Sequence, residues 1–208
     1  LLLNVNQVMV LLMSKTGIYI HIPFCKSKCD YCNFFSIAEC DTLQISSYVK
    51  RLILEINDMP NDLFPFDADT IYFGGGTPSM LLPEHIDSII DALKKRFSIS
   101  KDSEISLEMN PEHISYDFLS SLVSIGINRI IIGIQSFDPY LRKFIGRKGT
   151  LDFLNKMDIF FDNKSFVHCV DLITGIPGQK EEKVLADLIK ITDFLPEHIS
   201  LYLLSIED

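Results

Sequence analysis

The stretch 17–32 is Gly-Ile-Tyr-Ile-His-Ile-Pro-Phe-Cys-Lys-Ser-Lys-Cys-Asp-Tyr-Cys, an apolar, isoleucine-rich run that leads directly into three closely spaced cysteines. Residues 17–22 predict a strand, and Cys25, Cys29 and Cys32 follow it on a loop with the spacing Cys-x3-Cys-x2-Cys. Three thiolates suit a 4Fe-4S cluster in which one iron keeps an open position. The segment therefore predicts an iron-sulfur site just after the first strand.

Two other interpretations of these cysteines stay open on sequence alone. A structural zinc ion would need a fourth ligand from Cys40 or His21, but zinc sites favour two Cys-x2-4-Cys knuckles separated by a longer gap. The thiols could also be packing residues, yet buried cysteines behave as hydrophobes and these are interleaved with Lys, Ser and Asp. A cluster fits the spacing better than either. Cys40 and Cys169 are interpreted as ordinary core or surface thiols.

Downstream of the cysteines, short β-branched runs alternate with amphipathic stretches, which is the pattern of repeated βα units around a parallel sheet. The runs expected to form strands are 17–22, 70–73, 104–108, 129–134, 165–172 and 198–204. The stretches expected to form helices are 42–57, 83–97, 115–125, 151–161 and 181–194. Asp41 is placed to cap the first helix, and Pro83 to begin the second.

This order of elements predicts an α/β fold, namely a partial, open TIM-like barrel of about six βα units with mainly parallel strands. We assign residues 14–208 to this barrel and residues 1–13 to an N-terminal extension of unknown structure. The last predicted strand has no covering helix after it. We therefore expect the chain to be the N-terminal barrel portion of a longer protein, with a C-terminal region missing.

The composition argues against several partners. With a net charge of -9, a pI near 5.0 and no cluster of Lys and Arg, the chain offers no surface for nucleic acid. Its five cysteines are an odd number, and a chain of 208 residues needs no disulfides, which together indicate a reducing cytoplasm. Residues 1–13 are apolar but lack a basic flank and are too short to span a bilayer, so we expect no integral membrane span.

Polar and glycine-rich positions recur where the predicted strands end. The run 74–77, Gly-Gly-Gly-Thr, follows the second strand, and Glu108, Gln135 and Asp171 belong to the next three strand ends. In a barrel of βα units the functional residues lie at the carboxyl ends of the strands. A glycine run lets a small polar ligand approach the backbone, although a tight strand-to-helix turn would have the same sequence. The sequence therefore predicts a ligand site at this edge.

The cysteine spacing and six further segments resemble the radical S-adenosylmethionine (SAM) superfamily, and within it the oxygen-independent coproporphyrinogen III oxidase family. The cysteine spacing is the defining motif of the superfamily. The other matching segments are Tyr-Ile-His-Ile-Pro-Phe-Cys at 19–25, Gly-Gly-Gly-Thr-Pro-Ser at 74–79, Glu-Met-Asn-Pro at 108–111, Gly-Ile-Asn-Arg-Ile-Ile-Ile-Gly-Ile-Gln-Ser-Phe at 126–137, Asp-Leu-Ile-Thr-Gly-Ile-Pro-Gly-Gln at 171–179 and His-Ile-Ser-Leu-Tyr at 198–202. Together they cover most of 17–208 in order.

The resemblance implies that Cys25, Cys29 and Cys32 hold a 4Fe-4S cluster whose open iron binds the amino and carboxylate groups of SAM. The positions that match SAM-binding or cluster-neighbouring residues of the family are Tyr19, Tyr31, Gly75, Gly76, Thr77, Glu108, Gln135, Arg147 and Asp171. Without the resemblance, Arg147 would be interpreted as a surface arginine in a basic run, and Glu108 as a solvated charge. No residue is assigned a catalytic role, and no haem ligand is assigned.

The residues after the last cluster cysteine separate two functions that fit the resemblance. The oxidases, which decarboxylate coproporphyrinogen III to protoporphyrinogen IX, typically carry Cys-x3-Cys-x2-Cys-x-Cys. Here Asn33 and Phe34 follow Cys32, an ending typical of the HemW subgroup of haem chaperones. The favoured function is therefore a haem chaperone that binds a 4Fe-4S cluster and SAM and binds or transfers haem. A catalytically inert structural or regulatory barrel is the alternative from another class.

The same resemblance implies haem or a porphyrin as the small-molecule partner, together with an electron donor and a haem-acceptor protein that the sequence does not identify. The chain departs from its relatives at Tyr202-Leu203-Leu204, where they commonly have Tyr-Gln-Leu. We expect this change to remove a polar contact near the end of the sixth strand.

Overall fold

A computed structural model of the chain describes residues 16–60, 67–147 and 151–205. The extension assigned to 1–13 lies outside these ranges, as does Lys148 of the basic run beside Arg147.

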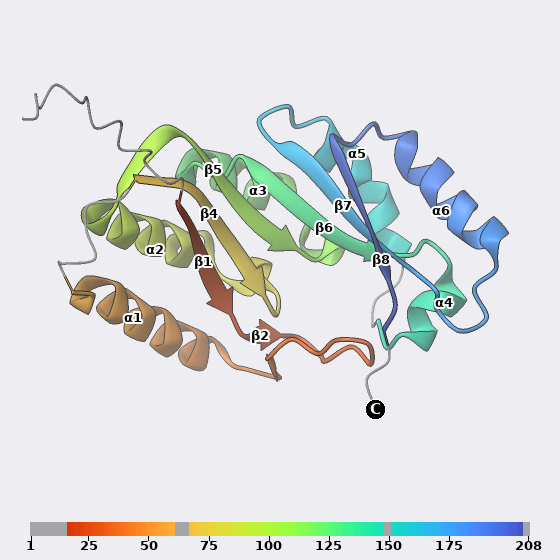
Figure 1. Ribbon diagram of the computed structural model, residues 1–208, viewed down its shortest axis with the longest axis horizontal. Coiled ribbons are helices and arrows are strands. Elements are labelled where there is room, and N and C mark those ends of the chain that lie inside the picture. Colours follow the sequence, from red (N-terminus) through yellow and green to blue (C-terminus); the bar gives the residue numbers. More distant parts are fainter. Residues whose placement is uncertain (1–15, 61–66, 148–150, 206–208) are drawn as a thin grey trace, which may run out of the picture.

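Six parallel strands form one sheet in the order β1-β4-β5-β6-β7-β8, as the βα pattern predicts (Figure 1). Every neighbouring pair in this order is parallel. In the described residues β1 pairs only with β4 and β8 only with β7, so the barrel is open. The strands are β1 (Thr16–Ile22), β4 (Asp67–Gly75), β5 (Ser98–Met109), β6 (Arg129–Gln135), β7 (Val167–Thr174) and β8 (His198–Leu203).

Helices connect the strands and bury their apolar faces against the sheet. They are α1 (Thr42–Asp58), α2 (Pro83–Arg96), α3 (Tyr116–Ile125), α5 (Met157–Phe161) and α6 (Glu181–Thr192). The predicted cap of α1 is present as a capping box, in which Asp41 accepts from the Gln44 backbone and the Gln44 side chain accepts from the Asp41 backbone. The core between helices and sheet contains fully buried side chains such as Ile71, Phe73 and Ile90.

Four local features differ from the sequence prediction. The segment predicted as one helix over 151–161 begins as a 3-10 helix, η4 (Leu151–Lys156), before α5. Strand β5 starts six residues earlier than predicted, where Ser98 and Ile99 pair with β4 ahead of a register shift. A short helix α4 (Pro139–Phe144) and a two-stranded sheet of β2 (Phe24–Cys25) and β3 (Ile37–Ala38) were not predicted. The remaining elements are the 3-10 turns η2 (Pro78–Met80) and η3 (Pro111–His113).

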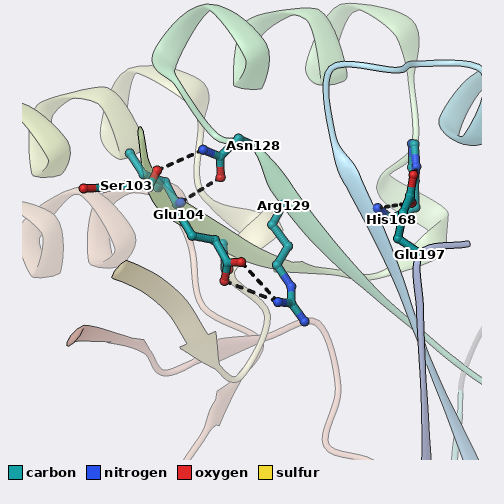
Figure 2. Close-up of polar contacts among 8 residues, drawn as sticks. Ser103, Glu104, Asn128, Arg129, His168 and Glu197 are labelled. Atoms are coloured by element: carbon teal, nitrogen blue, oxygen red, sulfur yellow. Dashed lines mark hydrogen bonds and ion pairs between the residues drawn. The ribbon is translucent and has the colours of Figure 1, made fainter. Parts of the chain in front are cut away.

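Polar contacts join the starts of β6, β7 and β8 to neighbouring strands (Figure 2). The Asn128 side chain donates to the Ser103 carbonyl at 2.9 Å and accepts from the Ile105 amide at 2.8 Å, while Arg129 pairs with Glu104 at 3.2 Å. These bonds help to set the register of β6 beside β5. They lie away from the carboxyl edge, where the predicted site residues gather.

No helix within the described ranges is both long enough and apolar enough to cross a membrane.

Candidate functional site

A cavity of about 500 Å³ opens at the carboxyl edge of the sheet. Eight of the nine residues predicted to contact SAM or neighbour the cluster line it, and Tyr19 is the exception. Cys32 lines it as well. Among the described residues, the wall comprises Tyr31, Cys32, Asn33, Phe34, Gly75, Gly76, Thr77, Glu108, Met109, Asn110, Ile131, Gly133, Gln135, Arg147, Asp171, Ile173, Tyr202, Leu203, Leu204 and Ser205. Residues that lie far apart in sequence therefore meet at one site, as the strand-end rule predicts.

The cysteine loop is fixed at both ends. Cys25 is buried on the two-residue strand β2, which pairs with β3 on the return of the loop. Between Cys29 and Cys32 the chain turns, and the Cys32 amide donates to the Cys29 carbonyl at 3.2 Å. The Asp30 amide donates to the Ile145 carbonyl at 3.2 Å, which joins the tip of the loop to the end of α4. All five cysteines of the chain are free thiols.

The electrostatics of the loop suit a cationic group. Burial raises the pKa of the Cys32 thiol, and negative charge on Cys25 and Cys29 raises it further, against a backbone bond at Phe34 and the charge of Lys28, which lower it. Thiolates brought this close are stabilised when iron neutralises them. The Thr77 hydroxyl also donates to the Cys25 sulfur at 3.5 Å. The donor set therefore fits a thiolate-bound cluster.

The two residues considered as a fourth zinc ligand are engaged elsewhere. His21 accepts from the Tyr19 hydroxyl at 3.1 Å through Nδ1 and donates from Nε2 to the Phe35 carbonyl at 2.9 Å. The Cys40 thiol points to the Ile37 carbonyl at 3.7 Å. In the described part of the chain no three His, Cys, Asp or Glu side chains could hold one metal ion. In a 4Fe-4S cluster each thiolate binds a different iron, so the three ligands need not converge on a point.

The glycine run is required by close packing and also borders the cavity. Gly75 has φ +112, and a side chain there would meet the His21 ring at 2.6 Å. A Cβ on Gly76 would lie 2.7 Å from the Phe24 carbonyl and 3.0 Å from the Cys25 sulfur. The bare backbone therefore lets β4 touch the cysteine strand, and the same bare backbone forms part of the cavity wall.

Glu108 is a half-buried acceptor rather than a solvated charge. Tyr72 donates to its Oε1 at 2.8 Å and the Gly75 amide to its Oε2 at 3.2 Å. Burial raises the pKa of Glu108, these two bonds lower it, and the negative charge of Asp171 raises it. Each oxygen keeps further acceptor capacity, which suits a ligand ammonium or hydroxyl.

Asp171 lies inside β7 and not at its end, which corrects the sequence expectation. Its side chain faces the cavity from the sheet, and its buried Oδ1 has no hydrogen-bond partner. Burial raises the pKa of Asp171, and a hydrogen bond from Ser200 opposes this. A buried carboxylate oxygen without a donor is costly unless a ligand supplies one.

Arg147 is part of the cavity wall, so its interpretation as a surface arginine is wrong. Its Nη2 donates to the Asn110 side chain at 2.7 Å and to the Gly133 carbonyl at 2.6 Å. Its Nε is buried without a partner. The guanidinium thus has a donor left for an anionic ligand group.

The two predicted tyrosines have different surroundings. Tyr31 is mostly buried in the wall. Burial is the main cause that raises the pKa of its hydroxyl, and the positive charge of Arg147 lowers it. Tyr19 is 55% exposed, stacks on Tyr72 at 6.1 Å between ring centroids and binds His21. Tyr19 therefore supports the residues beside the cavity without lining it.

Sequence reasoning missed Tyr72 and Phe34 as site residues, whereas Asn110, expected with Glu108 at the end of the third strand, lines the cavity. Tyr72 lies two residues before Gly74, and side chains two apart on a strand share a face. That alternation could have found Tyr72. Phe34 is 64% exposed beside the cavity, and no local pattern distinguishes it from a surface residue.

Comparison with known proteins agrees with this geometry. The family model described as "Radical SAM superfamily" matches residues 19–189. Two curated relatives, each named heme chaperone HemW, are 36% identical to this chain: the protein of Buchnera aphidicola subsp. Acyrthosiphon pisum (strain APS) over 193 residues and that of Escherichia coli (strain K12) over 197 residues. Each alignment covers 92% of this chain and 51% of the relative, so the chain spans about half the length of these proteins.

A solved structure is similar over the same region. It is the coproporphyrinogen III oxidase HemN from Escherichia coli, described as a radical SAM enzyme, with 27% identity and a TM-score of 0.82. The match covers 91% of this chain and 44% of that one. From the family match, the parallel open barrel and the cysteine loop at its carboxyl edge, we conclude that this chain belongs to the radical SAM superfamily.

Proposed function

We propose that this chain is the barrel portion of a haem chaperone of the radical SAM type, which binds a 4Fe-4S cluster and SAM and binds or transfers haem. Membership of the superfamily implies the cluster and SAM. The haem part of the proposal rests on the relatives, whose name describes them as heme chaperones. Five free thiols also agree with the reducing cytoplasm expected for such a protein.

One observation carries the preference for a chaperone over an oxidase. Phe34 stands two residues after Cys32, where the oxidases typically have a fourth cysteine, and its side chain lines the cavity. An exposed aromatic ring at this position offers apolar contact to a planar ligand and no thiolate. Leu203, which stands where relatives commonly have a glutamine, lines the same cavity together with Leu204.

In this proposal Cys25, Cys29 and Cys32 hold the cluster, and its function when bound is to supply one electron to SAM. The Thr77 hydroxyl steadies the Cys25 sulfur. Cys25 is buried, so this thiolate would hold its iron away from solvent.

The remaining wall residues would bind and orient SAM. The Glu108 carboxylate would accept from its ammonium or ribose, and the free Oδ1 of Asp171 would accept from a hydroxyl or amine. Arg147 would donate from its unpartnered Nε to a carboxylate, and Gln135 would supply an amide.

Gly75, Gly76 and Thr77 would let the ligand approach the β4 backbone. Tyr31 would contact the cluster or SAM from the loop, and Tyr19 would support the site through His21.

Two other functions remain as outcomes of the test. Oxidative decarboxylation of coproporphyrinogen III is favoured by the 0.82 TM-score with HemN. An inert structural barrel would have no need of Cys25, Cys29 and Cys32 in one loop. An electron donor and a haem-acceptor protein complete the proposed system.

The test begins with anaerobic reconstitution of the whole chain with iron and sulfide. We expect about four irons per chain and the electron paramagnetic resonance (EPR) signal of a reduced 4Fe-4S cluster, which changes when SAM is added. The Cys29→Ala variant should lose the cluster, whereas the Cys40→Ala control should keep it. A Cys29→Ala protein that assembles the same cluster would refute the ligand assignment.

Haem titration and turnover then separate the functions. Haem binding without decarboxylation of coproporphyrinogen supports the chaperone. Production of 5'-deoxyadenosine coupled to coproporphyrinogen turnover supports the oxidase. A chain that forms no cluster and binds neither SAM nor haem supports the inert barrel.

A further inference from the structure

Gln135 has a backbone conformation that few residues other than glycine adopt. Its φ is +71, in the left-handed region, although its side chain is 9% exposed and borders the cavity. A residue in this region persists only where surrounding contacts hold it there. The turn that follows β6 must therefore be held from outside.

The carbonyl before Gln135 is fixed by two donors. The Ile134 carbonyl accepts from the Ser136 amide at 2.9 Å and from Nη1 of Arg142 at 2.6 Å. Arg142 is only 1% exposed and also contacts Glu112, so it is itself held in place. The N-terminal side of the turn is thus anchored to α4.

The residues after Gln135 are held by one carboxylate from a distant helix. Asp187 of α6 accepts from the Ser136 hydroxyl at 2.6 Å and from the Phe137 amide at 2.9 Å. It is 5% exposed and takes no part in the cavity wall formed by the described residues. Hydrogen bonds from buried donors to a carboxylate are strong, so these two bonds can hold a strained backbone.

Two neighbouring residues on the same face of α6 also meet this turn, but at its exposed side. Lys183 pairs with Asp138 at 2.7 Å with 57% of the lysine side chain exposed, and Lys190 lies over the Phe137 ring at 4.8 Å. Residues four and three positions apart on a helix share a face. Exposed ion pairs contribute little to stability, so Asp187 is the residue of this face that holds the conformation of the turn.

We propose that Asp187 is a positioning residue that holds the turn 135–137 so that the Gln135 side chain faces the ligand cavity. The SAM-binding part of this inference rests on the proposed function of the site. Asp187 would act through Gln135 and would not touch SAM.

The first test measures the turn without any cofactor. Hydrogen exchange of the segment 134–138, followed by mass spectrometry, should become faster in Asp187→Ala and stay unchanged in the matched control Lys183→Ala. Asp187→Asn should recover most protection, because its Oδ1 can accept from the Phe137 amide while its Nδ2 donates to the Ser136 oxygen. If Asp187→Ala does not fold, Ser136→Ala removes one of the same bonds. Exchange at the wild-type rate in Asp187→Ala, or in Ser136→Ala where it replaces that variant, would overturn the proposal.

The second test uses the reconstituted chain and titrates SAM by calorimetry under anaerobic conditions. Asp187→Ala and Gln135→Ala should each weaken SAM binding about tenfold, the equivalent of one hydrogen bond, with unchanged iron content. The double variant should bind no more weakly than Gln135→Ala alone. Weaker binding in Gln135→Ala with normal binding in Asp187→Ala would overturn the positioning role and leave the proposed function intact. A wild-type chain that binds no SAM would reject the proposed function, and the exchange experiment would still decide whether Asp187 holds the turn.

Discussion

Replacing Gly76 with alanine adds one methyl group where β4 touches the cysteine strand. The added Cβ would lie 2.7 Å from the Phe24 carbonyl, 3.0 Å from the Ile22 carbonyl and 3.0 Å from the Cys25 sulfur. Two of these three atoms belong to the backbone, and the Gly76 amide already donates to the Ile22 carbonyl at 2.8 Å. Backbone carbonyls cannot rotate away as a side chain can, so the strand that carries Cys25 must move.

Overpacking of this kind costs about 1–3 kcal/mol. For a domain of this size, a loss of about 2 kcal/mol lowers Tm by roughly 4–8 °C. The displacement acts directly on Cys25, so we expect the variant to bind less iron after reconstitution as well as to melt earlier.

The assay compares Tm by circular dichroism and iron per chain in wild type, Gly76→Ala and Gly126→Ala. Gly126 caps α3 with φ +101, and its Cβ would meet nothing within 4 Å. Its replacement should cost about 1 kcal/mol through backbone strain and leave the iron content unchanged. A Gly76→Ala protein with wild-type Tm and iron content would refute the packing argument. Equal iron loss in both variants would show that instability, and not the contact with Cys25, causes it.

Two further predictions concern carboxylates. Asp171→Asn should raise Tm at pH 7 by roughly 2–4 °C, because it removes a buried charge whose Oδ1 has no partner, while it weakens SAM binding. Burial raises the pKa of Asp171, so the ionised carboxylate lowers the stability of the folded wild type, and this penalty disappears when the group is protonated. The difference in Tm between variant and wild type should therefore shrink as the pH falls toward 3.8. A difference that does not depend on pH would contradict this. For Glu197, burial raises the pKa, but the hydrogen bonds from the His168 amide and ring together outweigh it and lower the pKa below its ordinary value of 4.5, so its stabilisation is present above pH 4.5 and is lost as the pH falls further. Glu197→Gln should therefore melt earlier than wild type at pH 7 and approach it in acid, and a difference in Tm that stays constant from pH 7 to pH 3 would count against these hydrogen bonds.

Much of the fold could be predicted because each βα unit carries its own periodicity. Strands such as 129–134 and helices such as 83–97 were expected within one or two residues of β6 and α2. The elements that were missed depend on partners distant in sequence. Strand β5 begins as early as Ser98 because Ser98 and Ile99 pair with Asp67 and Ala68 of β4, and Phe24–Cys25 becomes a strand because Ile37–Ala38 returns beside it.

The sequence by itself determined the order of the βα units, the spacing of the three cysteines and the polar positions near the strand ends, because these are local patterns. Only the tertiary structure decided that Arg147 lies in the cavity wall, that the Oδ1 of Asp171 is buried without a partner and that Tyr19 lies outside the wall. It also decided that the left-handed turn at Gln135 is held by Asp187, 52 residues later in the chain. The physical reason is that burial and hydrogen-bond partners are set by residues that meet only after the sheet has curved.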